Sequence, residues 1–179
     1  MGKLFYIMGK SASGKDTIYQ RLLRNPEFSL ERLVIYTTRP IRDGELDGRE
    51  YHFVTEEDFQ KLKAEGKIIE DRGYETVYGL WRYFTADNMN LEEKSYLGIG
   101  TLESYEKLKA YYGEEKIRPI YIEVEDGERL KRAIAREETQ ETPKYEEMCR
   151  RFLADAQDFS EEKIRQAGIS HRFSNMDGA

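Results

Sequence analysis

A glycine-containing segment near the start of the chain has the residue types and spacing of a phosphate-binding loop. Residues 9–15 read Gly-Lys-Ser-Ala-Ser-Gly-Lys and match the pattern G-x-x-x-x-G-K. In this pattern the glycines let the backbone curl until several N–H groups face one anion, and the helix that follows adds the positive end of its dipole. Lys15 can reach the β- and γ-phosphates of a nucleotide. The segment therefore predicts binding of ATP and transfer of its terminal phosphoryl group. The alternative for such a composition is a solvated turn.

The residue after this lysine departs from the pattern. Where the pattern has Ser or Thr, whose hydroxyl binds Mg²⁺, this chain has Asp16, followed by Thr17. Because Mg²⁺ accepts carboxylate ligands, we expect Asp16 to bind the Mg²⁺ that accompanies ATP, directly or through water. The alternative is that Asp16 only caps the helix. The residues predicted to contact ATP in this segment are Gly9, Ser11, Ala12, Ser13, Gly14, Lys15, Asp16 and Thr17.

A second group of residues could hold another phosphate. Arg39 and Arg42 lie three residues apart, and Tyr51 follows shortly after them. Arginine binds phosphate through two parallel N–H donors, and a tyrosyl hydroxyl adds a third donor. This trio predicts a site for the phosphate of an acceptor molecule. The alternative is that the arginines form surface ion pairs with Glu45, Asp47 or Glu50.

The elements expected around these residues alternate between strands and helices, which is typical of a parallel α/β sheet. The apolar run 4–8 predicts a strand that is buried on both faces, and a helix is expected over 14–24. Further strands are expected at 33–36, 95–99, 118–124 and 169–173, and further helices at 101–112, 126–136 and 143–166.

The alternation stops between residues 40 and 90. This stretch contains several glycines and short alternating pieces rich in Tyr and Phe, and Thr55 with Asp58 predicts the capped start of a helix over 56–65. We therefore expect an inserted small α+β lobe at 39–90, within a core domain made of 1–38 and 91–179.

Composition narrows the classes of function. The chain has 179 residues, with 39% hydrophobic and 36% charged residues and a net charge of −6, which disfavours a broad nucleic-acid or anionic-membrane surface. Its single cysteine, Cys149, forms no internal disulfide, which fits a reducing compartment. The apolar run near the amino terminus is too short for a signal peptide or a membrane span. We expect a cytoplasmic protein with small-molecule partners, either a monomer or a homodimer.

The segment around the two arginines resembles the acceptor-binding segment of guanylate kinases. Residues 37–54 read T-T-R-P-I-R-D-G-E-L-D-G-R-E-Y-H-F-V. The family pattern is T-T-R-x-x-R-x-G-E-x-x-G-x-x-Y-x-F-V. Together with the phosphate loop, this resemblance implies a P-loop NTPase-type parallel sheet flanked by helices, an acceptor-binding lobe and a helical lid at about 137–147.

The resemblance also implies roles for single residues. Glu70 falls where the family has a glutamate that accepts hydrogen bonds from guanine, and Tyr78 falls where a tyrosine helps to bind the acceptor phosphate. Asn175 is similar to a family asparagine near the adenine of ATP. The residues expected to stabilise the transferred phosphoryl group are Lys15, Arg39, Arg132, Arg136 and Arg151. For the last three, which lie in or near the lid, the alternative is ion pairing with Glu128 and other acids on exposed helices.

The chain departs from the family at the base of the acceptor. Ile35 and Leu80 stand where hydroxyl residues commonly lie near guanine, and Gly98 and Gly100 stand where the family has two aspartates. Glu70 is then the main base-reading residue. We expect Asp16 to replace the carboxylate that is missing at Gly98, near the metal.

These features favour reversible transfer from ATP to GMP or dGMP, giving ADP and a nucleoside diphosphate. A related kinase with another phosphorylated acceptor, such as ribose 1,5-bisphosphate or a deoxynucleotide, is one alternative, because ribose bisphosphate phosphokinases often carry Gly-Lys-Asp as residues 14–16 do. A non-catalytic guanylate kinase-like domain that binds phosphorylated peptides is the other.

Overall fold

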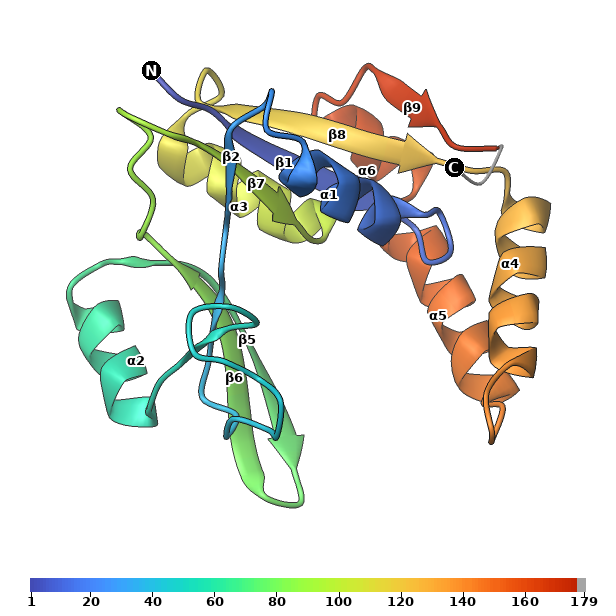
Figure 1. The fold of residues 1–179 in the computed structure, drawn as a ribbon, viewed down its shortest axis with the longest axis horizontal. Coiled ribbons are helices and arrows are strands. Elements are labelled where there is room, and N and C mark those ends of the chain that lie inside the picture. Colours follow the sequence, from blue (N-terminus) through green and yellow to red (C-terminus); the bar gives the residue numbers. More distant parts are fainter. Residues whose placement is uncertain (177–179) are drawn as a thin grey trace.

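A five-stranded parallel sheet forms the centre of the molecule in the computed structural model, which describes residues 1–176 (Figure 1). The strand order is β2-β7-β1-β8-β9, and all four pairings are parallel. The strands are β1 (Leu4–Gly9), β2 (Leu30–Arg32), β7 (Ser95–Ile99), β8 (Ile117–Glu123) and β9 (Arg172–Ser174). The predicted α/β class is confirmed, and β1 lies at the middle of the sheet as its apolar run requires.

Helices cover both faces of this sheet. Alternate side chains of β1 enter two separate cores, because successive strand residues point to opposite faces: Leu4 packs with α3 and α6, and Ile7 packs with α1. The helices are α1 (Lys15–Arg24), α3 (Leu102–Tyr112), α4 (Asp126–Glu138), α5 (Tyr145–Asp158) and α6 (Glu161–Gln166). None of the helices within residues 1–176 has the length and apolar composition needed to span a bilayer.

A second, four-stranded sheet projects from the core (Figure 1). Its order is β4-β3-β6-β5, and helix α2 packs against one face through Phe59, which contacts Phe84. The elements are β3 (Tyr36–Thr37), β4 (His52–Phe53), α2 (Glu56–Ala64), β5 (Ile68–Thr76) and β6 (Gly79–Ala86). The capped helix start predicted at Thr55 is confirmed: its hydroxyl accepts from the Asp58 amide, and the Asp58 carboxylate accepts from the Thr55 amide.

A helical hairpin made of α4 and α5 projects from the core in the same direction as the second sheet and is separated from it (Figure 1). The turn between these helices lies at residues 139–144, within the range predicted for the lid. The final three residues of the predicted core part, 177–179, lie outside the described residues.

Two predicted elements are wrong. The strand expected at 33–36 is absent: β2 ends at Arg32, and the chain then leaves the central sheet and begins β3 of the second sheet at Tyr36. The helix expected to run unbroken over 143–166 is two helices, because the chain breaks at Phe159 and the Ser160 hydroxyl accepts from the Lys163 amide to start α6.

Candidate active site

The loop at residues 9–15 joins the carboxyl end of β1 to the start of α1. Two of its residues have left-handed backbone conformations, Ala12 with φ 62° and Gly14 with φ 83°, and the Ser13 amide donates to the Lys10 carbonyl at 3.2 Å. Among residues 1–176, no side chain caps the start of α1 at Gly14. The amides of the first turn of α1 can therefore bind an anion such as phosphate.

Asn175 packs against this loop and holds it through a hydrogen bond. Its side-chain amide donates to the Ser13 carbonyl at 2.9 Å, and the residue is buried. A β-carbon on Gly14 would lie 2.4 Å from the same amide nitrogen, so the close approach requires glycine. The structure thus places Asn175 as a support of the phosphate loop, and its contact with adenine stays a prediction.

A buried ion pair, which sequence analysis missed, holds the loop to the base of the helical hairpin. The Arg129 guanidinium on α4 donates to the Ser11 carbonyl at 3.0 Å, and Asp155 on α5 accepts from the Ser11 amide at 2.8 Å. The two side chains lie 3.7 Å apart, and Arg129 is only 2% exposed. We call Arg129 and Asp155 the loop clamp. The only sequence signal is that Arg129 lies three residues before Arg132 on α4, because Ser11 is more than 100 residues away from both members of the clamp.

Lys15 and Asp16 are the first two residues of α1, directly after the loop. The Lys15 ammonium is 3.9 Å from the Asp16 carboxylate, whose side chain is 86% exposed. Thr17 is exposed beside them. No cluster of three or more His, Cys, Asp or Glu side chains in residues 1–176 could hold a metal without other ligands. A single accessible carboxylate nevertheless fits Mg²⁺, which typically binds one or two carboxylates together with substrate phosphates.

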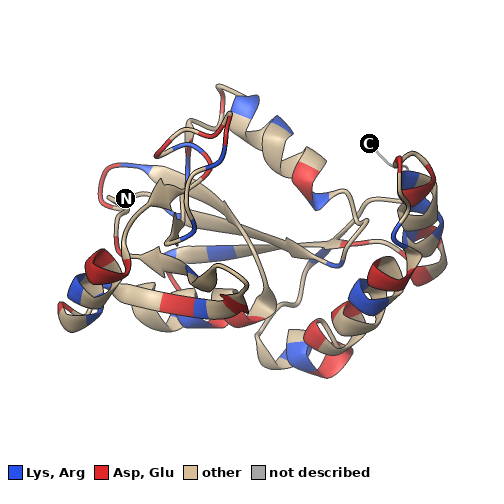
Figure 2. Cartoon of the chain, turned by 90° about the horizontal axis from the view of Figure 1, so that it is seen from below, with Lys and Arg blue, Asp and Glu red and all other residues tan. Residues whose placement is uncertain are grey.

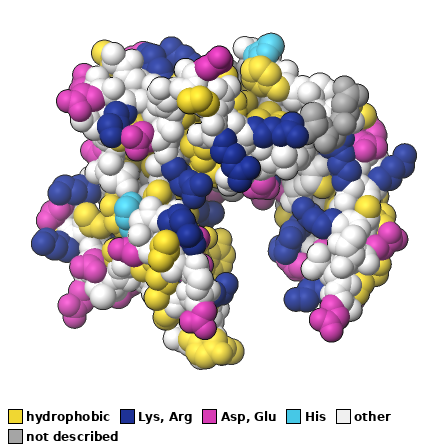
Figure 3. All heavy atoms as spheres, viewed as in Figure 1, with side chains coloured by type: hydrophobic (Ala, Val, Ile, Leu, Met, Phe, Trp, Pro, Cys, Tyr) yellow, Lys and Arg dark blue, Asp and Glu magenta, His cyan; other side chains and the backbone are white. Residues whose placement is uncertain are grey.

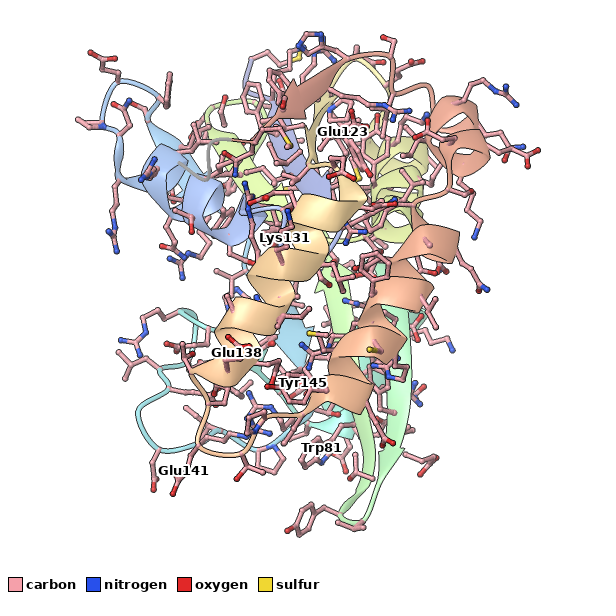
Figure 4. All side chains as sticks on the ribbon, turned by 90° about the vertical axis from the view of Figure 1, so that its right-hand side faces the viewer. Trp81, Glu123, Lys131, Glu138, Glu141 and Tyr145 are labelled. Atoms are coloured by element: carbon pink, nitrogen blue, oxygen red, sulfur yellow. The ribbon has the colours of Figure 1, made fainter. Side chains whose placement is uncertain are left out.

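The predicted lid arginines lie on the helical hairpin. Arg132 donates to Glu128 at 3.0 Å, which is the alternative pairing considered above, and also to the backbone carbonyls of Asn175 and Met176 at 2.9 and 2.8 Å. Arg136 and Arg151 line one narrow hollow between α4 and α5. Figure 4 shows the two helices side by side.

Charges of both signs alternate along this hairpin. Figure 2 shows Lys and Arg interspersed with Asp and Glu on α4 and α5. Figure 3 shows basic side chains on the side that faces the wide hollow between the hairpin and the rest of the molecule. Arg151 illustrates the mixture, because its Nε lies 3.3 Å from a Glu147 carboxylate oxygen. Arg132 and Arg151 each have an acidic partner on the hairpin, and the contact of the three lid arginines with phosphate stays a prediction.

Arg39 is buried two residues after the end of β3 and already has an anionic partner. Its guanidinium forms a fork with Glu45, with distances of 2.8 and 3.1 Å, and lies over the ring of Tyr51 at 5.5 Å from its centroid. The hydrogen bond from Arg39 lowers the pKa of the Glu45 carboxyl below its usual value. The structure therefore brings Arg39 and Tyr51 together. It also shows the Arg39–Glu45 ion pair that was the alternative interpretation.

Arg42 is exposed beside this fork. Its backbone amide donates to Glu45 at 2.8 Å, so one carboxylate organises both predicted phosphate-binding arginines. The carboxylate already uses both terminal nitrogens of the Arg39 guanidinium, so an acceptor phosphate would either displace Glu45 or bind the remaining N–H donors.

The two predicted residues of the β5–β6 hairpin lie at its opposite ends. Glu70 is 5% exposed and accepts from the Thr85 hydroxyl at 2.8 Å. Tyr78 lies in the turn at the far tip, is 81% exposed and stacks on Trp81. Because β5 separates them, at a rise of about 3.3 Å per residue, the structure does not bring Tyr78 close to Glu70.

Tyr6 of β1 fills the space beside the two glycines that replace the family aspartates. A β-carbon on Gly98 would lie 2.8 Å from the Tyr6 ring, and one on Gly100 would lie 2.0 Å from its hydroxyl. The hydroxyl pairs with Ser104 at 2.7 Å, and burial raises the pKa of Tyr6 to about 12, so it stays neutral. The absence of carboxylates at Gly98 and Gly100 is therefore linked to the large side chain of Tyr6, which lies 92 or more positions away in the sequence.

We expect Gly100→Asp to lower the free energy of unfolding by about 1–3 kcal/mol, because Tyr6 must move to admit the new side chain. Tyr6→Phe removes the nearest atom, so the double variant should recover part of this loss. Urea unfolding of the four proteins of the cycle measures both effects. A Gly100→Asp variant as stable as the parent would contradict the steric coupling.

Comparison with known proteins shows similarity to guanylate kinases. The model described as guanylate kinase matches residues 1–163. The guanylate kinase of Schizosaccharomyces pombe is 40% identical over 101 residues, covering 56% of this chain and 44% of that protein. The guanylate kinase of Wolbachia pipientis wMel is 31% identical over 157 residues, covering 87% and 75%.

The fold has a solved counterpart. A crystal structure of guanylate kinase from Anaplasma phagocytophilum superposes with a TM-score of 0.59 at 20% identity, covering 97% of this chain and 77% of that one. The matched regions are partial, however, since this chain spans about half the length of the first curated relatives, 44% and 45%.

Proposed function

Because the chain belongs to the guanylate kinase family, we propose that it transfers the γ-phosphoryl group of ATP to GMP or dGMP, giving ADP and GDP or dGDP. The observation that carries this proposal is the phosphate loop, whose first-turn amides and Lys15 form an anion site at the carboxyl edge of the sheet. In the proposal, residues 39–90 form the acceptor lobe, residues 1–38 and 91–179 form the core, and 137–147 form the lid.

The proposed reaction needs no nucleophilic side chain. A phosphate oxygen of the acceptor attacks the γ-phosphorus while the bond to the β–γ bridging oxygen breaks, and ADP keeps that oxygen. The protein contributes alignment and charge neutralisation. Lys15 faces the β- and γ-phosphates, Arg39 and Arg42 hold the acceptor phosphate with Tyr51, and Glu70 accepts from guanine. Arg132, Arg136 and Arg151 then stabilise the charge in transfer when the hairpin closes.

Mg²⁺ bound with ATP would supply positive charge that offsets the negative charge of the phosphates. In this chain Asp16 would hold it, because the Asp16 carboxylate is accessible and lies one residue beyond the phosphate-loop lysine. The neighbouring Lys15 ammonium would offset the charge that this carboxylate brings towards the phosphates.

We expect Asp16→Ala to weaken Mg²⁺ binding to the protein–ATP complex by roughly 10-fold or more, as loss of a metal-supporting group does. Calorimetric titration of Mg²⁺ into the complex measures this without turnover. Gln20→Ala, at an exposed position one turn further along α1, provides the comparison. Unchanged Mg²⁺ affinity in the Asp16 variant would show that Asp16 has no part in the metal site.

An ADP-release assay tests the function. Purified protein with Mg²⁺ and ATP is offered GMP, dGMP, AMP, the pyrimidine monophosphates and ribose 1,5-bisphosphate. The proposal expects turnover with GMP and dGMP at least about 100-fold faster than with the others, since unpaired buried polar groups discriminate strongly. Faster turnover with ribose 1,5-bisphosphate, or none with any acceptor, would overturn it.

A further inference from the structure

One face of the β5–β6 hairpin carries an arginine two residues from Glu70. Paired residues of an antiparallel hairpin share a face, and alternate residues of each strand return to it. The register pairs Arg72 with Tyr83 and Tyr74 with Trp81. The opposite face is the one that α2 covers, where Arg82 lies over the Phe59 ring. Arg72 therefore points to the face that α2 leaves open.

This open face borders the space between the acceptor lobe and the core. A cleft of about 530 Å³ is lined by Arg72 and Tyr74 on one side and by the start of α3, the end of α5 and helix α6 on the other. A second hollow of about 340 Å³ is lined by Arg72, Tyr74, Trp81 and Tyr83. Arg72 lies where the two hollows meet, because it lines both.

The guanidinium of Arg72 is available to a ligand. Its side chain is 42% exposed, and its contact with a carboxylate is a long one, 3.5 Å from Nε to a Glu70 oxygen. Within residues 1–176 the structure gives the Arg72 side chain no hydrogen bond. The other Glu70 oxygen accepts from Thr85. The buried carboxylate of Glu70, which accepts hydrogen bonds, and the half-exposed guanidinium of Arg72, which donates them, therefore lie side by side.

This pairing matches the chemistry of guanine. A carboxylate can accept from the N1–H and 2-amino groups, but it leaves the O6 and N7 acceptors of the base without partners. Arginine binds those two atoms bidentately, and this is the commonest specific contact with guanine. If the protein enclosed the O6/N7 edge without offering hydrogen-bond donors, its affinity for guanine would fall, because buried polar groups need partners.

Resting on the proposed function, we propose that Arg72 reads the O6/N7 edge of the acceptor base, so that Glu70 and Arg72 together select a 6-oxopurine. Tyr74, Trp81 and Tyr83 supply an aromatic wall beside the base in the same hollow. Arg72 is then a specificity-determining residue of the acceptor lobe.

The test combines Arg72→Met with base analogues. Calorimetry measures the affinity of the parent and the variant for GMP, for 7-deaza-GMP, which lacks the N7 acceptor, and for IMP, which lacks the 2-amino group. We expect the parent to bind 7-deaza-GMP roughly 10-fold more weakly than GMP. In the variant, GMP affinity should fall by about 10-fold or more and this preference should disappear, whereas the ratio of GMP to IMP affinity should persist because it depends on Glu70.

The kinetic readout and the control separate recognition from folding. With ATP saturating, Arg72→Met should raise KM for GMP and leave kcat within about 3-fold, because the contact is with the base. Arg165→Met, at an exposed arginine of α6, should change neither. Equal losses for GMP and 7-deaza-GMP, or no loss, would overturn the inference alone. A parent protein that neither binds nor phosphorylates GMP would overturn the proposed function as well.

Discussion

Replacing Lys15 with methionine should lower kcat/KM for phosphoryl transfer by at least about 10³-fold, equivalent to roughly 4 kcal/mol of transition-state stabilisation. Lys15 follows the left-handed Gly14 at the start of α1, and its side chain is only 21% exposed. Its ammonium is therefore held near the anion site with little shielding by water, where a positive charge has a large effect on charge developing between the phosphates.

The coupled ADP-release assay measures this loss, and urea unfolding checks that the variant is as stable as the parent. Lys10 offers a matched control, because it belongs to the same loop but its ammonium lies 3.6 Å from Asp126. Lys10→Met should cost far less activity than Lys15→Met. A Lys15→Met variant that retained a tenth of the parent kcat/KM would remove the main support for phosphoryl transfer at this loop.

Arg129→Leu should lower the free energy of unfolding by about 3–5 kcal/mol. Arg129 is buried, donates to the Ser11 carbonyl and to Asp126, and packs over the Phe152 ring at 4.7 Å. Its loss leaves the Asp155 carboxylate, 16% exposed, without its cationic partner. Because native proteins are stable by only about 5–15 kcal/mol, this change is a large fraction of the total.

Urea unfolding measures the effect, and ATP binding by calorimetry should weaken with it because the clamp holds Ser11 in the phosphate loop. Adding Asp155→Asn to Arg129→Leu should restore part of the stability, since no unpaired charge then remains buried. Arg24→Leu, at an exposed position on α1, should change stability by no more than about 0.5 kcal/mol. A similarly small effect of Arg129→Leu would mean that the clamp contributes little.

Local patterns predicted much of the fold. The strand at 95–99 and the capped helix after Thr55 follow from short-range signals, namely an apolar run and a reciprocal cap. The strand predicted at 33–36 failed because this apolar run serves two sheets: the Leu33 amide still bonds to Leu97 of the central sheet, but Tyr36 already pairs with Phe84 of the second. The pattern of apolar residues within one segment cannot show that the chain passes from one sheet to another.

The residues of the candidate site that could not be predicted from the sequence were missed for the same reason, because their contacts join distant segments. The phosphate loop and the segment with Arg39 are contiguous motifs, so their residues could be identified directly. The loop clamp and the contact of Tyr6 with Gly100 join residues about a hundred or more positions apart, and no spacing rule connects them. Tyr78 was identified only by its similarity in sequence; it lies at the exposed tip of the hairpin, and its contact with the acceptor phosphate stays a prediction.

The fork between Arg39 and Glu45 has a thermodynamic consequence for acceptor binding. With its guanidinium already neutralised by a carboxylate of the same chain, the pocket carries a tethered counter-ion. An acceptor phosphate that enters here meets an ion pair rather than a bare cation, whether it displaces Glu45 or binds the remaining N–H donors of Arg39. In either case the counter-ion of Arg39 stays attached to the protein, so this arginine releases no dissolved ion to the solvent, and its contribution to acceptor affinity depends only weakly on salt concentration.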